Sequence, residues 1–129
     1  MKLDETFGIH EQSLKLHARR AEVLAGNIAN ADTPGYKSRD FDFREVLNQQ
    51  MPQPTRMKTT HSRHIQMDSG VMPDSHLKYR IPNQPSLDGN TVDSQLEHTA
   101  FAENSLEYQA SLRFVSGAIK KLRLAIRGQ

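Results

Sequence analysis

The residues best suited to chemistry are three histidines in the middle of the chain, His61, His64 and His76. His61 and His64 are three residues apart, a spacing that would put both side chains on one helical turn, where Asp68 or Asp74 could add an oxygen ligand to a metal. The same histidines could serve a hydrolase as bases. However, no HExxH motif and no cysteine accompany them, and no helical period surrounds them. We therefore interpret them as solvated side chains and predict no metal site.

The other candidate catalytic groups lack the neighbours that catalysis requires. Asp40 and Asp42 flank Phe41 and could act as an acid–base pair, but this alternation is more typical of a short strand or extended arm with aromatic residues on one side. His10 and His17 fall on an apolar stripe, where a histidine is usually packed and hydrogen-bonded. No serine lies in a GxSxG elbow, and the seven glycines form no phosphate loop. The sequence thus predicts no enzyme, no cofactor and no small-molecule substrate.

The composition indicates a protein that depends on other subunits. The 129 residues are enough for one domain, and 17 basic against 15 acidic residues give a net charge of +2, which does not indicate a nucleic-acid partner. The hydrophobic fraction of 36% and the mean hydropathy of −0.70 are low for a compact globule. There is no cysteine, so disulfides and thiolate sites are excluded. Because the chain can bury only a thin core, we expect partner subunits to add stability.

The beginning of the chain carries no apolar stretch of the kind found in secretory signals. No segment approaches the roughly 20 apolar residues of a membrane-spanning helix. We therefore expect either a cytosolic protein or one exported by a route that does not cleave a signal peptide.

Two segments have the apolar period of long helices. In the first, at residues 4–30, Phe7, Leu14, Ala21 and Ile28 stand seven apart, and His10, His17 and Leu24 take the intervening positions. In the second, the apolar positions alternate in steps of four and three with one polar break: Phe101, Ser105, Tyr108, Leu112, Val115, Ile119, Leu122 and Ile126.

The ends of the second helix are marked by its sequence. Asp93 and Ser94 are candidate N-caps, and Ser94 with Glu97 matches a capping box. Gly128 is expected to end the helix. The basic residues Lys120 to Arg127 are attributed to the favourable charge at a helix C-terminus.

The fold class that follows is mainly α, with long N- and C-terminal helices pairing as a coiled coil. Residues 48–91 hold five of the six prolines and four of the five methionines, so we expect an irregular middle with short β pieces near 57–60 and 77–81. The expected organisation is one structural domain: a helix at 1–30, a turn and extended joint at 31–47, the polar middle at 48–91 and the second helix at 92–129.

The stretch NIANADTPGYKSRDFDF, residues 27–43, has the properties of an assembly joint. Asn27 can bond to neighbouring backbone groups, and Asn30 suits a left-handed residue at the helix end. The Pro34–Gly35 turn fixes the direction in which the chain leaves the helix. The predicted interface residues of this joint are Leu24, Asn27, Ile28, Asn30, Thr33, Pro34, Gly35, Tyr36, Phe41 and Phe43. The predicted coiled-coil seam comprises Phe7, Leu14, Ala21, Phe101, Tyr108, Leu112, Val115, Ile119, Leu122 and Ile126.

Several motifs resemble one known family. NIANADTPGYK, at 27–37, closely resembles the N-terminal signature of bacterial flagellar rod and hook proteins, and SRDFDF, PSLDGNTVD at 85–93 and AENSLEYQASLRF at 102–114 resemble its proximal-rod type. The resemblance implies a non-enzymatic subunit of the drive shaft that transmits motor torque to the hook. It implies packing of the terminal helices into a helical tube and export through the flagellar type III secretion apparatus without signal cleavage.

The same resemblance implies the partners and the location. The partners would be other copies of the chain, other rod proteins, the rod–membrane-ring junction protein, the inner-membrane ring and the flagellar export apparatus, with no nucleic acid. The location would be the basal-body rod in the periplasmic space.

Two other functions remain open at this point. A coiled-coil adaptor, chaperone or export-associated regulator would bind one partner stoichiometrically and enter no large assembly. A hydrolase that uses the histidine-rich middle would lose its function when His61 or His64 is replaced by alanine.

Overall fold

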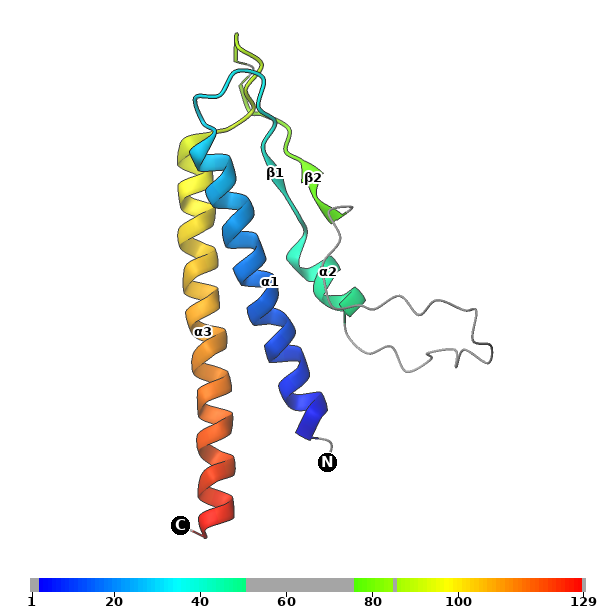
Figure 1. Ribbon diagram of the computed structural model, residues 1–129, viewed down its shortest axis with the longest axis vertical. Helices are drawn as coiled ribbons and strands as arrows, with labels where there is room; N and C mark the ends of the chain where they lie inside the picture. Colours follow the sequence, from blue (N-terminus) through cyan, green and yellow to red (C-terminus); the bar gives the residue numbers. More distant parts are fainter. Residues whose placement is uncertain (1–2, 51–75, 85, 129) are drawn as a thin grey trace, which may run out of the picture.

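The computed structural model describes residues 3–50, 76–84 and 86–128. Its elements in chain order are α1 (Leu3–Ala29), β1 (Arg39–Asp40), α2 (Phe43–Gln50), β2 (Lys78–Tyr79) and α3 (Ser94–Arg127) (Figure 1). With 27 and 34 residues, α1 and α3 are about 40 and 50 Å long. The predicted mainly α class with two long terminal helices is confirmed.

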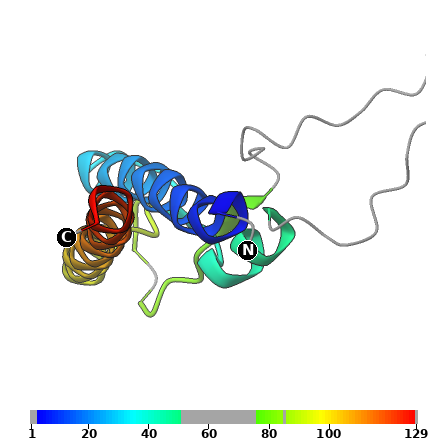
Figure 2. The ribbon, with the colours of Figure 1, turned by 90° about the horizontal axis from the view of Figure 1, so that it is seen from below.

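The two long helices run antiparallel, side by side, and their register is set by polar pairs. Ser13 contacts Ser111 at 3.5 Å between the hydroxyl oxygens, and Nδ1 of His17 lies 2.9 Å from Oδ1 of Asn104. Nearer the other end, Asn27 of α1 bonds to Glu97 of α3. Seen end-on, α3, α1 and α2 follow one another across the molecule (Figure 2). At the end that holds both chain termini, α3 extends beyond α1 (Figure 1).

The predicted seam on α3 differs from the line that meets α1. Five predicted seam residues are 36% to 84% exposed: Phe101, Tyr108, Leu112, Ile119 and Ile126. Instead, the residues of α3 bonded to α1 are Glu97, Asn104 and Ser111, which recur every seven positions and lie four residues before the predicted line. The residues of α3 that hydrogen-bond to α1 thus form a polar line beside the predicted apolar line. A role of the apolar line between subunits stays a prediction.

Of the three features predicted for the ends of α3, two are present in the structure. Asp93 is the N-cap, with its carboxylate accepting hydrogen bonds from the backbone N–H groups of Gln95 and Leu96, and Gly128 ends the helix at φ 70°. The predicted Ser94–Glu97 capping box is wrong. The carboxylate of Glu97 is fully buried and bonds instead to Asn27 and Arg80.

A short helix replaces most of the extended arm expected after Phe41. Asp42 accepts a hydrogen bond from the N–H of Glu45 at 3.0 Å and so caps the first turn of α2. Phe41 is buried with Leu16 and Val46, and the half-buried residues Phe43, Leu47 and Leu77 pack around them. The extended arm is thus limited to Arg39–Asp40, and α2 runs across the boundary that we expected at 47/48.

The two-stranded ribbon agrees with one of the two predicted β pieces. β1 pairs antiparallel with β2, with Arg39 opposite Tyr79 and Asp40 opposite Lys78. The piece expected at 77–81 is therefore confirmed, and the piece expected at 57–60 lies outside the described residues.

The turn after α1 has the backbone expected at Gly35 but not at Asn30. Gly35 has φ 73°, and its N–H donates to the carbonyl oxygen of Asp88 at 2.9 Å. No non-glycine residue with a described backbone has a positive φ, so Asn30 is not left-handed. Its side chain instead donates to the carbonyl of Gly26 at 2.8 Å and accepts a hydrogen bond from the Thr33 hydroxyl.

Replacing Gly35 with alanine is expected to lower the free energy of unfolding by about 1 kcal/mol, because a Cβ disfavours the left-handed conformation. The matched control is Gly8→Ala in α1, where an added Cβ meets no atom within 4 Å and where alanine is the better helix former, so its effect should have the opposite sign. Urea unfolding followed by circular dichroism measures both. Equal effects at the two positions would contradict the prediction.

Candidate assembly joint

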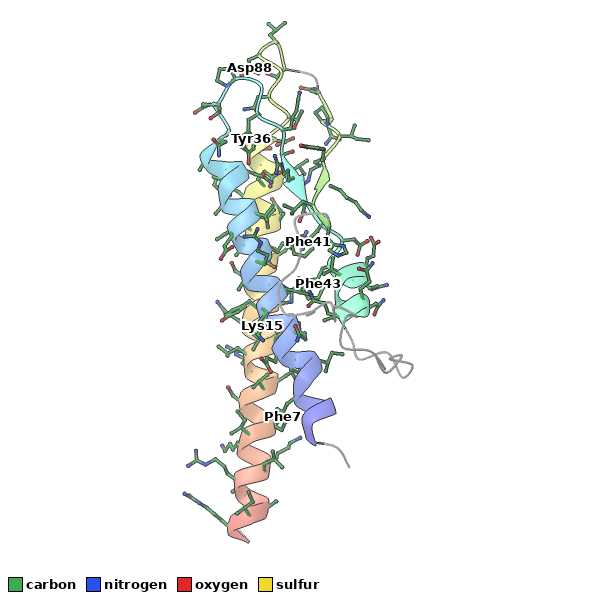
Figure 3. The ribbon with its side chains drawn as sticks, turned by 45° about the vertical axis from the view of Figure 1, so that its right-hand side comes forward. Phe7, Lys15, Tyr36, Phe41, Phe43 and Asp88 are labelled. Atoms are coloured by element: carbon green, nitrogen blue, oxygen red, sulfur yellow. The ribbon has the colours of Figure 1, made fainter. Side chains whose placement is uncertain are left out.

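The segments that link the helices gather at the end of the molecule opposite the chain termini (Figure 1). Residues 30–40, which follow α1, lie against residues 86–93, which precede α3. We call these two segments, with Asn27 and Glu97 at the helix ends and Arg80 next to β2, the joint. Tyr36 and Asp88 lie at this end, while Phe41 and Phe43 point into the region between α1 and α2 (Figure 3).

Asn27 holds four parts of the joint together and is fully buried. Its Nδ2 donates to the carbonyl of Arg39 at 2.7 Å and to Glu97 at 3.1 Å. Its Oδ1 accepts from the N–H of Arg39 at 3.1 Å and from the Tyr36 hydroxyl at 3.3 Å. All four hydrogen bonds of the amide are made, so this one side chain fixes the exit of the chain from α1 relative to β1 and α3.

A chain of alternating charges joins the ribbon to both long helices. Arg80, next to β2, donates to Glu97 of α3 at 2.8 Å and to Asp40 of β1 at 2.6 Å. Asp40 also accepts two hydrogen bonds from Arg20 of α1, at 3.0 and 3.2 Å. The hydrogen bonds to Asp40 raise the pKa of Arg20, against an opposing effect of burial. Two cations thus neutralise two anions, which removes the large cost of burying Glu97.

Asn90 closes the open end of α1. Its Nδ2 lies within 3.0 Å of the carbonyl oxygens of Asn30, Ala31 and Thr33, at the helix end where carbonyls lack partners within the helix. Its Oδ1 accepts from the N–H of Val92 at 2.7 Å. Beside it, hydrogen bonds from the Ser86 hydroxyl and the N–H of Asn90 lower the pKa of Asp88.

The change Asn90→Asp is expected to destabilise the protein by about 3 kcal/mol, and Asn90→Ala by about 2 kcal/mol. A carboxylate has the shape of the amide but would point oxygen instead of N–H at three carbonyls. Alanine only removes the amide donor, and the carbonyls of Asn30 and Thr33 keep the N–H groups of Thr33 and Tyr36. Asn83→Asp, at an exposed position, is the control and should change stability by less than about 0.5 kcal/mol. Thermal unfolding measures the stability of the three variants. The prediction is refuted if Asn90→Asp destabilises the protein less than Asn90→Ala.

His17 is a packed structural residue, as predicted from its place on the apolar stripe. Its side chain is 4% exposed, its Nδ1 bonds to Asn104, and its ring stacks on Phe43 with 4.2 Å between centroids. Asn104 also donates to the backbone carbonyl of His17 at 2.9 Å. This pair connects α1, α3 and α2 at one level.

The comparisons with known proteins address the same segment. The family model described as "Flagella basal body rod protein" matches residues 9–37, which include most of α1 and the turn of the joint. The flagellar basal body rod protein FlgB of Escherichia coli (strain K12) is 49% identical over 125 residues, covering 92% of this chain and 91% of the relative. FlgB of Aeromonas hydrophila is 44% identical over 131 residues, covering 100% and 98%. FlgB of Salmonella typhimurium (strain LT2) is 42% identical over 133 residues, covering 98% and 96%.

The chain belongs to the FlgB family of flagellar basal-body rod proteins. The resemblance read from its motifs is thereby confirmed, and the chain is a structural subunit of the basal-body rod. The stoichiometric adaptor is not favoured.

In this rod protein, the residues predicted for the joint have different surroundings. Leu24, Asn27 and Phe41 are buried, and Ile28, Asn30, Tyr36 and Phe43 are half-buried within the chain. Thr33, Pro34 and Gly35 are exposed and face solvent in the single chain. On α1, the predicted seam residues Phe7, Leu14 and Ala21 are half-buried.

Four residues that build the joint were missed as such in the sequence: Asp40, Arg80, Asn90 and Glu97. The seven-residue spacing of Glu97, Asn104 and Ser111 was a readable signal for a polar line on α3. Asp40 was considered only as an acid–base partner of Asp42. It is instead bound by two arginines, and Asp42 caps α2.

The described part of the rod protein gives no support to a metal site. Among these residues no group of three histidine, cysteine or acidic side chains could hold an ion. His61 and His64 lie outside them, and His76 is half-buried. No helix among the described residues has the length and apolar character needed to cross a membrane.

Proposed function

We propose that this rod subunit belongs to the proximal rod and assembles through the faces of its long helices into the shaft that transmits torque. The observation that supports this most is the apolar surface that α1 leaves uncovered on α3. Leu106, Phe114 and Ile119 are 45% to 67% exposed, and Leu112 is 46% exposed. Exposed apolar surface of this extent along one helix marks an interaction site.

The physical basis of assembly is the burial of this surface against neighbours. Each buried aliphatic or aromatic side chain stabilises by about 2 kcal/mol, so several such contacts per subunit add up along a shaft. A contact between different faces of identical or similar subunits generates a helical array where its rotation does not close a ring. The predicted seam residues on both helices would then lie between subunits.

The joint would transmit force between the helical wall and the ribbon. Its hydrogen bonds and ion pairs tie α1, β1, β2 and α3 into one unit, in which no buried side-chain nitrogen or oxygen of the described residues lacks a partner. A fully satisfied polar network is rigid, which suits torsional load. The exposed turn at Thr33 and Pro34 would contact an adjacent subunit. The single domain that we expected, with residues 48–91 as its middle, is part of the proposal.

Export, location and the remaining partners extend the proposal. The subunit would pass through the flagellar type III apparatus with no cleaved signal and reach the periplasmic part of the basal body. It would there contact the junction protein, the inner-membrane ring and sibling rod proteins, and would catalyse no reaction. The core supports passage in an unfolded state because only Leu16, Leu24, Phe41 and Val46 are buried hydrophobic residues in the described part.

Electron microscopy of basal bodies from cells that lack this chain tests the function. We expect particles that stop at the inner-membrane ring without a shaft, and cells that do not swim. Restoring the chain from a plasmid should restore both. Complete rods and hooks in the deletion strain would refute the assignment to the proximal rod.

A further inference from the structure

The second half of α3 is a long cationic surface that the macrodipole does not explain. From residue 108 to the helix end there is no acidic residue, and Arg113, Lys120, Lys121, Arg123 and Arg127 are basic. The dipole favours cations within the last turn, and only Arg127 lies there. The helix dipole therefore does not account for the other four.

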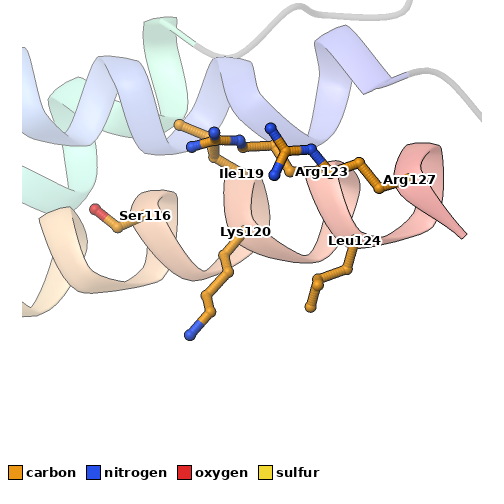
Figure 4. Close-up of a pocket in the computed structure, with 6 residues that line it drawn as sticks. All are labelled: Ser116, Ile119, Lys120, Arg123, Leu124 and Arg127. Carbon is orange, nitrogen blue, oxygen red and sulfur yellow. The ribbon is translucent and has the colours of Figure 1, made fainter. Parts of the chain in front are cut away.

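These cations have no anionic partner among the described residues. The ion pairs of the described chain involve Lys15, Arg19, Arg20, Lys78, Arg80 and His17, and none involves residues 113–127. A groove on the same stretch is lined by Ser116, Ile119, Lys120, Arg123, Leu124 and Arg127. Figure 4 shows Lys120 and Leu124 pointing away from α1. The groove therefore combines apolar side chains with unpaired cations, and its Lys120 and Leu124 side lies on the part of α3 that α1 does not cover.

The occupant of this groove must supply negative charge. A neighbouring copy that presented the same stretch of α3 would place its own cations opposite these, and like charges across an interface oppose binding. A neighbour shifted along the axis can instead present an acidic stretch. The first half of α3 illustrates such a stretch, with the exposed residues Glu103, Leu106 and Glu107.

We propose that the groove around Lys120 and Leu124 docks an acidic amphipathic helix of a rod subunit displaced along the shaft axis. Its carboxylates pair with Lys120, Arg123 and Arg127, and its apolar residues cover Ile119 and Leu124. The inference rests on the proposed assembly of the subunit into the shaft. It adds that contacts along the axis are selected by charge, whereas Phe101, Tyr108 and Leu112 of the apolar line serve other contacts.

Cross-linking tests the occupant directly, because the chain has no cysteine and an introduced thiol is unique. Ser116→Cys places a thiol in the groove, and Ala110→Cys, outside the groove on the exposed part of α3, is the control. Each variant is labelled with a photoreactive maleimide before assembly, and the linked peptide from purified basal bodies is identified by mass spectrometry. We expect Ser116→Cys to link to a helical segment of a rod subunit with at least two acidic residues. A lipid adduct, a segment without acidic residues, or no adduct would overturn the proposal.

Charge reversal tests the pairing. Lys120→Glu with Arg123→Glu should reduce the amount of chain in basal bodies about tenfold, because like-charge contact at an interface is strongly unfavourable. The control is the double variant Lys121→Glu with Arg44→Glu, which has the same net charge but changes exposed positions outside the groove. It should change incorporation less than about twofold. Equal losses in the two variants would overturn the proposal. If the unaltered chain is absent from basal bodies, the proposed function itself fails. If the chain is present but forms no cross-link to an acidic segment, only the docking proposal fails.

Discussion

Replacing Arg80 with alanine is expected to lower the free energy of unfolding by about 3 kcal/mol, because it leaves Glu97 buried without its cation. Asp40 would keep Arg20, so the loss falls mainly on Glu97. Arg80 is 28% exposed in its side chain, which places the effect at the lower end of the range for buried pairs. Urea unfolding of the purified chain measures the loss, and swarming on soft agar measures its effect on the assembled rod.

The control for this change is Arg44→Ala, since Arg44 is exposed and has the same charge. It should alter stability by less than about 0.5 kcal/mol. Adding Glu97→Gln to Arg80→Ala should recover part of the loss, because a neutral amide costs less to bury than an unpaired carboxylate. A loss at Arg80 no greater than that at Arg44 would show that the charge chain does not hold the joint.

The second large effect is expected on assembly with little effect on the single chain. Leu112 and Ile119 are each nearly half exposed on α3, so Leu112→Asp or Ile119→Asp adds a charge that water can still solvate in the free subunit. In the shaft, the same charge would be desolvated at a cost of several kcal/mol. We therefore expect the number of assembled rods to fall by roughly 100-fold or more. Circular dichroism should show unchanged helix content, and electron microscopy should show basal bodies without a shaft.

Ala110→Asp is the matched control, because Ala110 is an exposed residue of the same helix that lies outside the predicted seam. It should permit normal rods. If Leu112→Asp also permits normal rods, the apolar line of α3 is not a subunit interface, and the seam prediction is wrong between subunits.

The sequence predicts the long helices and their ends well because those features depend on local patterns. The period of the apolar residues and the caps at Asp93 and Gly128 need no knowledge of distant contacts. The short helix α2 was missed because the alternation of Asp40, Phe41, Asp42 and Phe43 resembles a strand. The spacing of Asp42 and Glu45, which matches a helix start, was the competing signal.

The joint could be located from its motif, but its contacts could not be derived. Asn27 meets Glu97 across 70 positions, and Arg80 reaches Asp40 across 40. No local rule specifies such pairs in a single sequence. The same limit applies to α3, where a count of apolar residues identifies one line while the neighbouring polar line pairs with α1. The apolar pattern shows that surface must be covered and does not show which molecule covers it.

The polar pairs between α1 and α3 also determine how far α1 reaches along α3. A slip of one turn would bring Glu97 against Leu24 instead of Asn27, and an unpaired carboxylate in that position would cost several kcal/mol. An apolar seam would tolerate the same slip, because another hydrophobic residue would replace the first. Every copy therefore holds the first turn of α1 at the same distance from the tip of α3. Identical placement of the two helices in every copy is what a shaft needs if its successive layers are to be evenly spaced and its axis straight.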